Sequence, residues 1–171
     1  MKTSVLILPV LLSAVFAASA ESLSADEIMA RAGATASTEH KTLFVHFDAS
    51  WCGYCKRLEA FLERPDVKPI FETYFVTVKL VLMENEKNKA LENAGAGQWL
   101  VRLGGPDALP FHAFTDSRGG LIVNSRRPTG GNIGYPDRPE EVDWFLQMIR
   151  KAAPKISPDE LAALGKALTT P

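Results

Sequence analysis

The hydrophobic residues in the middle of the chain follow two spacings, one typical of strands and one typical of helices. Four short runs are apolar throughout or at every second position and are rich in valine and aromatic residues, which favours strands. These predicted strands are residues 43–47, 75–82, 111–115 and 121–124. The last two flank the turn Asp116–Gly120, so we expect them to form an antiparallel hairpin.

Elsewhere, apolar residues recur every three or four positions, which predicts amphipathic helices. A capping box at Ser24–Glu27 begins a short helix through Ala32, and Gly33 to Glu39 is expected to be a polar connector. A helix interrupted by Pro65 follows the first strand. Further helical segments are predicted at residues 85–93, 98–103 and 139–151, and after the helix-capping Ser157.

The order strand, helix, strand, helix, strand, strand, helix predicts an α/β fold with a central mixed sheet. Its first two strands would be parallel and joined by a right-handed crossover. A length of 171 residues suits one domain. We assign residues 41–153 to this domain, 21–40 to an N-terminal helix and connector, and 154–171 to an appended C-terminal helix.

The first twenty residues are of a different kind. Lys2 precedes an apolar run from Val5 to Phe16, and Ala18 to Ala20 are small residues that suit a cleavage site. Residues 1–20 are therefore predicted to be a secretory signal peptide. A permanent anchor needs about 20 apolar residues, so we expect no anchor and an exported protein, either periplasmic or secreted.

The charges of the chain are nearly balanced, with 19 Lys and Arg against 20 Asp and Glu. A balanced chain offers no large electrostatic field to hold nucleic acid. No nucleic-acid partner is therefore expected.

The chain has two cysteines, Cys52 and Cys55, placed directly after the first predicted strand. Exported cysteines usually form structural disulfides, but so short a loop would remove little entropy from the unfolded chain. A zinc site would need two more ligands, from His40, His46, His112 or carboxylates. No second pair has metal-like spacing, so we expect reactive thiols and no metal.

The segment Trp51-Cys52-Gly53-Tyr54-Cys55-Lys56 after an apolar strand resembles the active site of the thioredoxin superfamily, and the Leu109–Pro110 step resembles its cis-proline. The element order extends this resemblance over about residues 41–151. It implies a thioredoxin-like fold and thiol–disulfide exchange, in which Cys52 attacks and Cys55 resolves. The cysteines carry the electrons, so no organic cofactor is implied. A sulfur at the start of a helix also ionises more readily, because backbone amides and the helix dipole favour the thiolate.

The resemblance also implies the residues that contact substrate. Pro110 would lie beside the cysteines, and Leu109 would pair its backbone with an extended peptide and make the groove more apolar. Trp51 is either an exposed aromatic shoulder or a core residue. Gly53 and Tyr54, between the cysteines, would tune the redox poise.

Two residues are candidates for proton transfer. His46 lies six positions before Cys52, where thioredoxins carry a buried carboxylate that assists the resolving cysteine. A histidine could serve this purpose near neutral pH, or could simply be satisfied by backbone hydrogen bonds. Lys56 would either stabilise the thiolate or be solvated. His112 is expected to pack or to lie at the surface.

Two hypotheses follow for function. The first is a monomeric, exported thiol–disulfide oxidoreductase that acts on protein thiols or disulfides and exchanges electrons with a membrane redox partner. The direction, reductase or oxidase, stays open. The alternative is a thioredoxin-like binding module that holds a metal ion or a client peptide without turnover.

Overall fold

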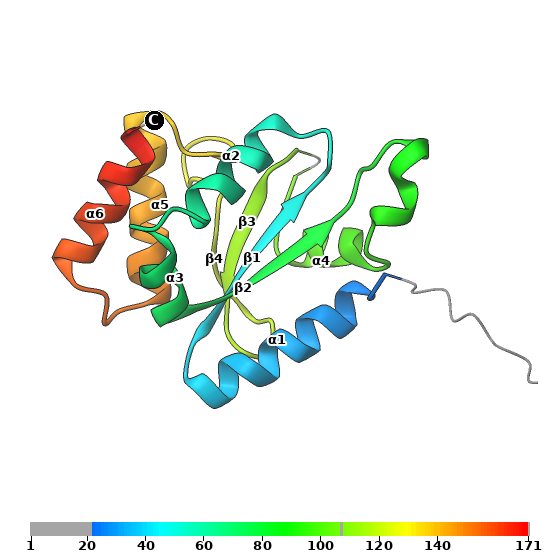
Figure 1. Cartoon of the computed structure of the whole chain (residues 1–171), viewed down its shortest axis with the longest axis horizontal. Helices are drawn as coiled ribbons and strands as arrows, with labels where there is room; N and C mark the ends of the chain where they lie inside the picture. The colour runs from blue at the N-terminus through cyan, green and yellow to red at the C-terminus, as the bar shows by residue number, and fades with distance from the viewer. Residues whose placement is uncertain (1–21, 107, 171) are drawn as a thin grey trace, which may run out of the picture.

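The computed structural model describes residues 22–106 and 108–170, so the predicted signal peptide lies outside the described residues. Four strands, β1 (Thr42–Asp48), β2 (Phe75–Val81), β3 (Phe111–Thr115) and β4 (Leu121–Asn124), form one sheet in the order β2-β1-β3-β4. Strands β1 and β2 are parallel, and β3 is antiparallel to both β1 and β4 (Figure 1). The predicted mixed sheet and its terminal hairpin are confirmed.

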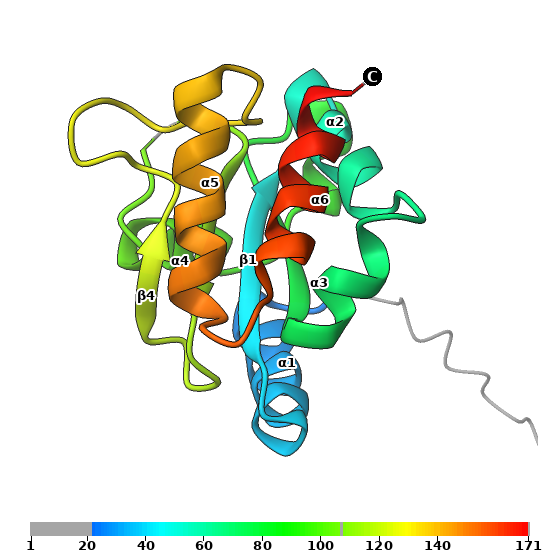
Figure 2. The ribbon, with the colours of Figure 1, turned by 90° about the vertical axis from the view of Figure 1, so that its left-hand side faces the viewer.

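Helices cover both faces of the sheet. They are α1 (Ala25–Glu39), α2 (Gly53–Leu62), α3 (Lys68–Tyr74), α4 (Ala96–Arg102), α5 (Pro139–Ala152) and α6 (Pro158–Thr169), with a 3₁₀ helix η1 (Glu86–Leu91) after β2. Helices α1 and α4 pack on one face, and α2, α3, α5 and α6 on the other. The C-terminal helix α6 lies beside α5 (Figure 2). Over residues 22–106 and 108–170, no helix is long and apolar enough to cross a membrane.

Helix α1 is longer than the sequence pattern indicated. The prediction of a connector from Gly33 to Glu39 was wrong, because the helix continues to Glu39 and ends where His40 takes a left-handed backbone conformation. Gly33 and Ala36 are buried, and a Cβ at position 33 would overlap the carbonyl of Ser117. This close approach explains a glycine inside a helix, since packing outweighs its poor helix propensity.

The core behind α2 is built around the fully buried ring of Phe44 on β1. Its centroid lies 5.3 Å from that of Phe71, 4.9 Å from Phe114 and 6.3 Å from Phe145. These rings come from α3, β3 and α5. Strand β1 is therefore fixed by aromatic packing along the face on which α2 rests.

We expect Phe44→Ala to lower the free energy of unfolding by about 3–5 kcal/mol, because the surrounding rings cannot close the cavity. Urea unfolding with an unchanged m value measures this loss. Leu121→Ala, at a residue 47% exposed, is the control and should change stability by roughly 0.5 kcal/mol or less. Equal losses in the two variants would contradict the assigned core.

Candidate active site

The two cysteines are joined at the point where the chain turns from β1 into α2. They form a disulfide with a Cα–Cα distance of 5.3 Å. Cys52 is the N-cap of α2, and its Sγ accepts a hydrogen bond from the backbone N–H of Cys55 at 3.2 Å. Cys52 is 4% exposed and Cys55 is 1% exposed. The sulfur of Cys52 thus has the helix-start environment that the sequence predicted.

The loop before the cysteines is anchored by residues that follow β2. The backbone N–H and the hydroxyl of Ser50 donate to the carboxylate of Glu84, at 2.5 Å and 2.7 Å. The indole Nε1 of Trp51 donates to the carbonyl of Met83 at 2.8 Å. The sequence analysis missed Glu84. Its position in the sequence could have indicated this contact. Glu84 follows β2 and Ser50 follows β1, and the carboxyl ends of these parallel strands meet at one edge of the sheet.

The residues predicted to contact substrate gather around the disulfide. Leu109 packs against a small cluster made of Ala49 and both cysteines, and the Leu109–Pro110 peptide bond is cis. Trp51 is 56% exposed and Tyr54 53% exposed, so Trp51 is an exposed shoulder and not a core residue. Gly53, between the cysteines, is exposed as well. An extended peptide can therefore approach beside Leu109, with aromatic surface on the α2 side.

His46 and Lys56 occupy very different surroundings. His46 is buried on β1, and this burial lowers the pKa of its imidazole to about 4. The ring is therefore neutral near pH 7, stacked on Phe44 with centroids 6.0 Å apart. Lys56 is exposed on α2. The structure brings His46 under the helix and leaves Lys56 on its outer surface.

His112 is the cross-strand neighbour of His46 on β3. It is fully buried between the rings of Phe44 and Phe145, with centroids 5.6 Å and 5.2 Å away. Neither ring nitrogen has a hydrogen-bond partner among the described residues. Burial lowers the pKa of His112 to about 3. His112 was expected either to pack in the core or to lie at the surface, and the structure shows it packed in the core.

A charge cluster that the sequence did not predict lies on the same face of the sheet, and of its three residues only Asp48 is buried. Asp48 is 3% exposed, and its Oδ2 lies 3.2 Å from the Nζ of Lys79. The two groups form an ion pair, but their geometry does not meet the criteria for a hydrogen bond. Lys79 also pairs with Glu59 of α2. Burial raises the pKa of Asp48, and Lys79 only partly opposes this. Burial would likewise raise the pKa of Glu59, but the hydrogen bond from Lys79 leaves it below its usual value.

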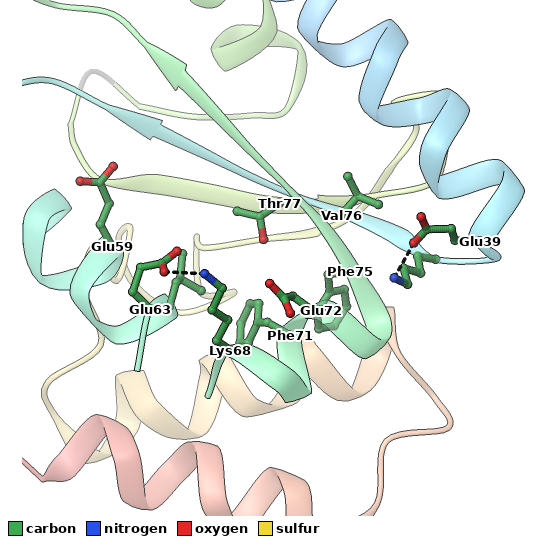
Figure 3. A pocket seen from close by; sticks show the side chains of 11 residues that line it. Glu39, Glu59, Glu63, Lys68, Phe71, Glu72, Phe75, Val76 and Thr77 are labelled. Atoms are coloured by element: carbon green, nitrogen blue, oxygen red, sulfur yellow. Dashed lines mark hydrogen bonds and ion pairs between the residues drawn. The ribbon is translucent and has the colours of Figure 1, made fainter. Parts of the chain in front are cut away.

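This charge cluster reaches both the cysteines and solvent. Ala49, which follows Asp48, belongs to one buried cluster with both cysteines. Glu59 lies one helical turn after Cys55, which brings their Cβ atoms to about 5–6 Å. Glu59 also lines an open cavity of about 700 Å³ between α2, α3 and β2, seen in Figure 3. A proton released near Cys55 would thus have carboxylates close by and water beyond them.

The two buried histidines should make stability depend on pH. Their pKa values of about 4 and about 3 lie below the ordinary value near 6.5. The unfolded chain therefore binds more protons between about pH 6.5 and 4, and the free energy of unfolding falls as the pH falls through this window. His112→Leu removes one of the two titrations, so we expect a shallower pH dependence than in the wild type.

Urea unfolding of both proteins between about pH 4.5 and 7 measures this difference. At pH 7 we expect His112→Leu to cost about 1 kcal/mol or less, because the ring has no hydrogen bond to lose. Parallel curves for the two proteins would contradict the assignment of His112 as a neutral buried ring.

Comparison with known proteins agrees with this geometry. Residues 26–117 match a family model described as thioredoxin-like. A disulphide isomerase from Xylella fastidiosa Temecula1 is similar in structure, with a TM-score of 0.51 and 18% identity over 88% of this chain and 95% of that one. The C-terminal domain of DsbD from Neisseria meningitidis, in its oxidised form, has a TM-score of 0.45 and 19% identity over 74% of this chain and 97% of that one. The search of curated proteins finds no match. Because the family model covers more than half of the 171 residues, and the mixed sheet carries a Cys-x-x-Cys disulfide at the start of α2, the chain belongs to the thioredoxin-like family.

Proposed function

We propose that the chain is an extracytoplasmic thiol–disulfide oxidoreductase that exchanges disulfides with protein substrates. The observation that carries the proposal is the Cys52–Cys55 disulfide at the N-terminus of α2, beside the exposed rings of Trp51 and Tyr54. Helix amides and the helix dipole stabilise a thiolate at Cys52 once the pair is reduced. Cys55 is the more buried sulfur, which suits a resolving cysteine.

In the reducing direction, the Cys52 thiolate attacks one sulfur of a client disulfide. The other client sulfur leaves as a thiolate, and a mixed disulfide joins Cys52 to the client. The Cys55 thiolate then attacks the Sγ of Cys52, the client's remaining sulfur leaves, and the protein is left with its own disulfide. Two electrons pass to the client, and the reverse sequence oxidises a client dithiol.

Cys55 must lose its proton before it can attack. We assign this proton to Asp48, which is buried at the end of β1, four residues before Cys52, and whose pKa is raised by burial. Glu59 and Lys79 connect Asp48 with the open cavity beside β2. His46, the candidate from the sequence, shares this face of the sheet but has an imidazole pKa of about 4. Lys56 is exposed, so we assign it no proton transfer. Its positive charge alone would act on the Cys52 thiolate.

The cellular setting is part of the proposal. The pattern of residues 1–20 supports export to the periplasm or the medium. There the protein would act as a monomer without a cofactor. A membrane redox partner would supply electrons to the cysteine pair or remove them. The reduction potential of the pair, measured against glutathione, decides whether the protein reduces or oxidises its clients. Thioredoxin, a reductant, has a potential of about −270 mV, and a strong oxidase has one of about −120 mV.

Substitution of the cysteines tests the proposal. With dithiothreitol as reductant, the wild-type protein should reduce insulin disulfides, and Cys52→Ser should abolish this activity because no attacking thiolate remains. Once reduced and freed of dithiothreitol, Cys55→Ser should still attack insulin but should stop at the mixed disulfide, which non-reducing electrophoresis detects. Activity retained by Cys52→Ser would contradict the assignment of Cys52 as the attacking residue, and a stoichiometric metal in an inactive wild-type protein would favour the binding module.

Substitution of Asp48 tests the assigned proton acceptor. Asp48→Asn should slow release of the client from the mixed disulfide by at least about tenfold near neutral pH, within the range of general-base effects. The first attack by Cys52 should change much less. Stopped-flow tryptophan fluorescence across pH separates the two steps. His46→Gln is the matched comparison, and a larger effect from His46→Gln than from Asp48→Asn would return the assignment to the histidine.

A further inference from the structure

Cys52 ends a tight turn that begins at Ala49. The backbone N–H of Cys52 donates to the carbonyl of Ala49 at 2.9 Å, so Ser50 and Trp51 are the two central residues of a β-turn. Both of these residues are exposed. The turn leads directly to Cys52 at the N-cap of α2. Its conformation therefore decides where the sulfur lies relative to the amides of the helix start.

Two consecutive residues after β2 hold this turn. The carbonyl of Met83 accepts the indole N–H of Trp51 at 2.8 Å, and the carboxylate of Glu84 accepts the backbone N–H and the hydroxyl of Ser50. Met83 has a φ of 58°, in the left-handed region that residues other than glycine rarely adopt. Such a conformation persists only where the surroundings impose it, and it often occurs at functional sites. Here it occurs at the residue that contacts Trp51 and immediately precedes Glu84.

The 3₁₀ helix η1 and the residues after it fix Glu84 in turn. The backbone N–H of Glu84 donates to the Oε1 of Glu92 at 2.8 Å, and the Nζ of Lys89 donates to the same oxygen at 3.1 Å. The side-chain amide of Asn88 donates to the hydroxyl of Ser50 at 2.8 Å. This hydroxyl therefore accepts from Asn88 while it donates to Glu84. Glu84 is 6% exposed, so its carboxylate has little freedom to move.

The place of this buried carboxylate points to a role in the exchange reaction. Burying a carboxylate costs free energy unless strong donors replace water, and here the donors belong to an exposed turn and not to the core. Ser50 lies two residues before the attacking sulfur. We propose that Glu84 is a positioning residue for thiol–disulfide exchange, which holds the Ala49–Cys52 turn so that the Cys52 sulfur stays at the start of α2. This inference rests on the proposed function.

Glu84 exerts this effect through geometry, because both of its carboxylate oxygens accept hydrogen bonds from Ser50. Glutamine at position 84 would keep an oxygen for the N–H of Ser50 and would offer an amide N–H to its hydroxyl, but would carry no charge. Alanine would remove both contacts. The two substitutions therefore separate the position of the turn from the charge of the carboxylate.

The reactivity of Cys52 tests the proposal in a Cys55→Ser protein that has been reduced and freed of dithiothreitol. We expect Glu84→Ala to slow attack on oxidised glutathione about tenfold near pH 6, because a loosened turn no longer holds the sulfur against the helix amides. The pH profile of alkylation by iodoacetamide should move to higher pH. Glu84→Gln should stay within about twofold of the parent protein. The matched control Glu86→Ala removes an exposed carboxylate of η1 and should leave both measurements unchanged.

The native cysteine pair gives a second measurement. In Glu84→Ala the equilibrium with glutathione should shift several-fold toward the protein disulfide, because the reduced form loses stabilisation of its thiolate. Glu84→Gln should keep the wild-type equilibrium. Ser50→Ala, which removes the hydroxyl but keeps the backbone N–H, should shift the equilibrium in the same direction by a smaller factor. This exposed substitution tests the role even where Glu84→Ala does not fold, and urea unfolding shows which variants are folded.

The two levels of inference fail differently. A folded Glu84→Ala protein with the parental attack rate, pH profile and glutathione equilibrium would overturn the positioning role and leave the oxidoreductase intact. An unchanged equilibrium in Ser50→Ala would overturn it as well, and so would equal effects of Glu84→Gln and Glu84→Ala, since the charge would then account for both. A wild-type protein that reacts with no disulfide would overturn the proposed function itself.

Discussion

Everything at the site depends on the hydrogen bond between the Cys55 N–H and the Cys52 sulfur, which caps α2 with a cysteine. A sulfur held there faces the unpaired amides of a helix start, which favour a negative charge. The geometry requires β1 to stop directly beneath α2 and the following loop to be rigid. Aromatic packing around Phe44 holds β1 in place beneath α2. The hydrogen bonds from Ser50 to Glu84 hold the loop.

The face of β1 beneath α2 changes character along its length. Phe44 is surrounded by aromatic rings, His46 is buried and neutral, and Asp48 is buried but ion-paired with Lys79. Side chains at alternate positions share a face of a strand, so three consecutive inward positions pass from a dry environment to a polar one. The ionisable end of this gradient lies nearest to Cys52 along the chain.

The disulfide and a cavity beside Leu109 draw on different parts of the chain. Residues 48–59 contain both sulfurs and two of the nearby carboxylates, whereas residues 125–138, between β4 and α5, form the opposite wall of this cavity. The two parts are joined through Arg57, which pairs with Asp137 and lies over the ring of Tyr135.

The sequence by itself determined the features that depend on neighbouring residues: the strand before Cys52, the helix after it, the spacing of the sulfurs and the terminal hairpin. These follow from short-range periodicity and from the capping of one helix. Only the tertiary structure decided that Asp48, Lys79 and Glu59 meet, that Asn132 holds Pro110, and that Gly33 lies inside a helix. Each of these contacts depends on strand register or on the packing of segments far apart in the chain. Local spacing shows which face a residue occupies, but not which residue from another element will lie against it.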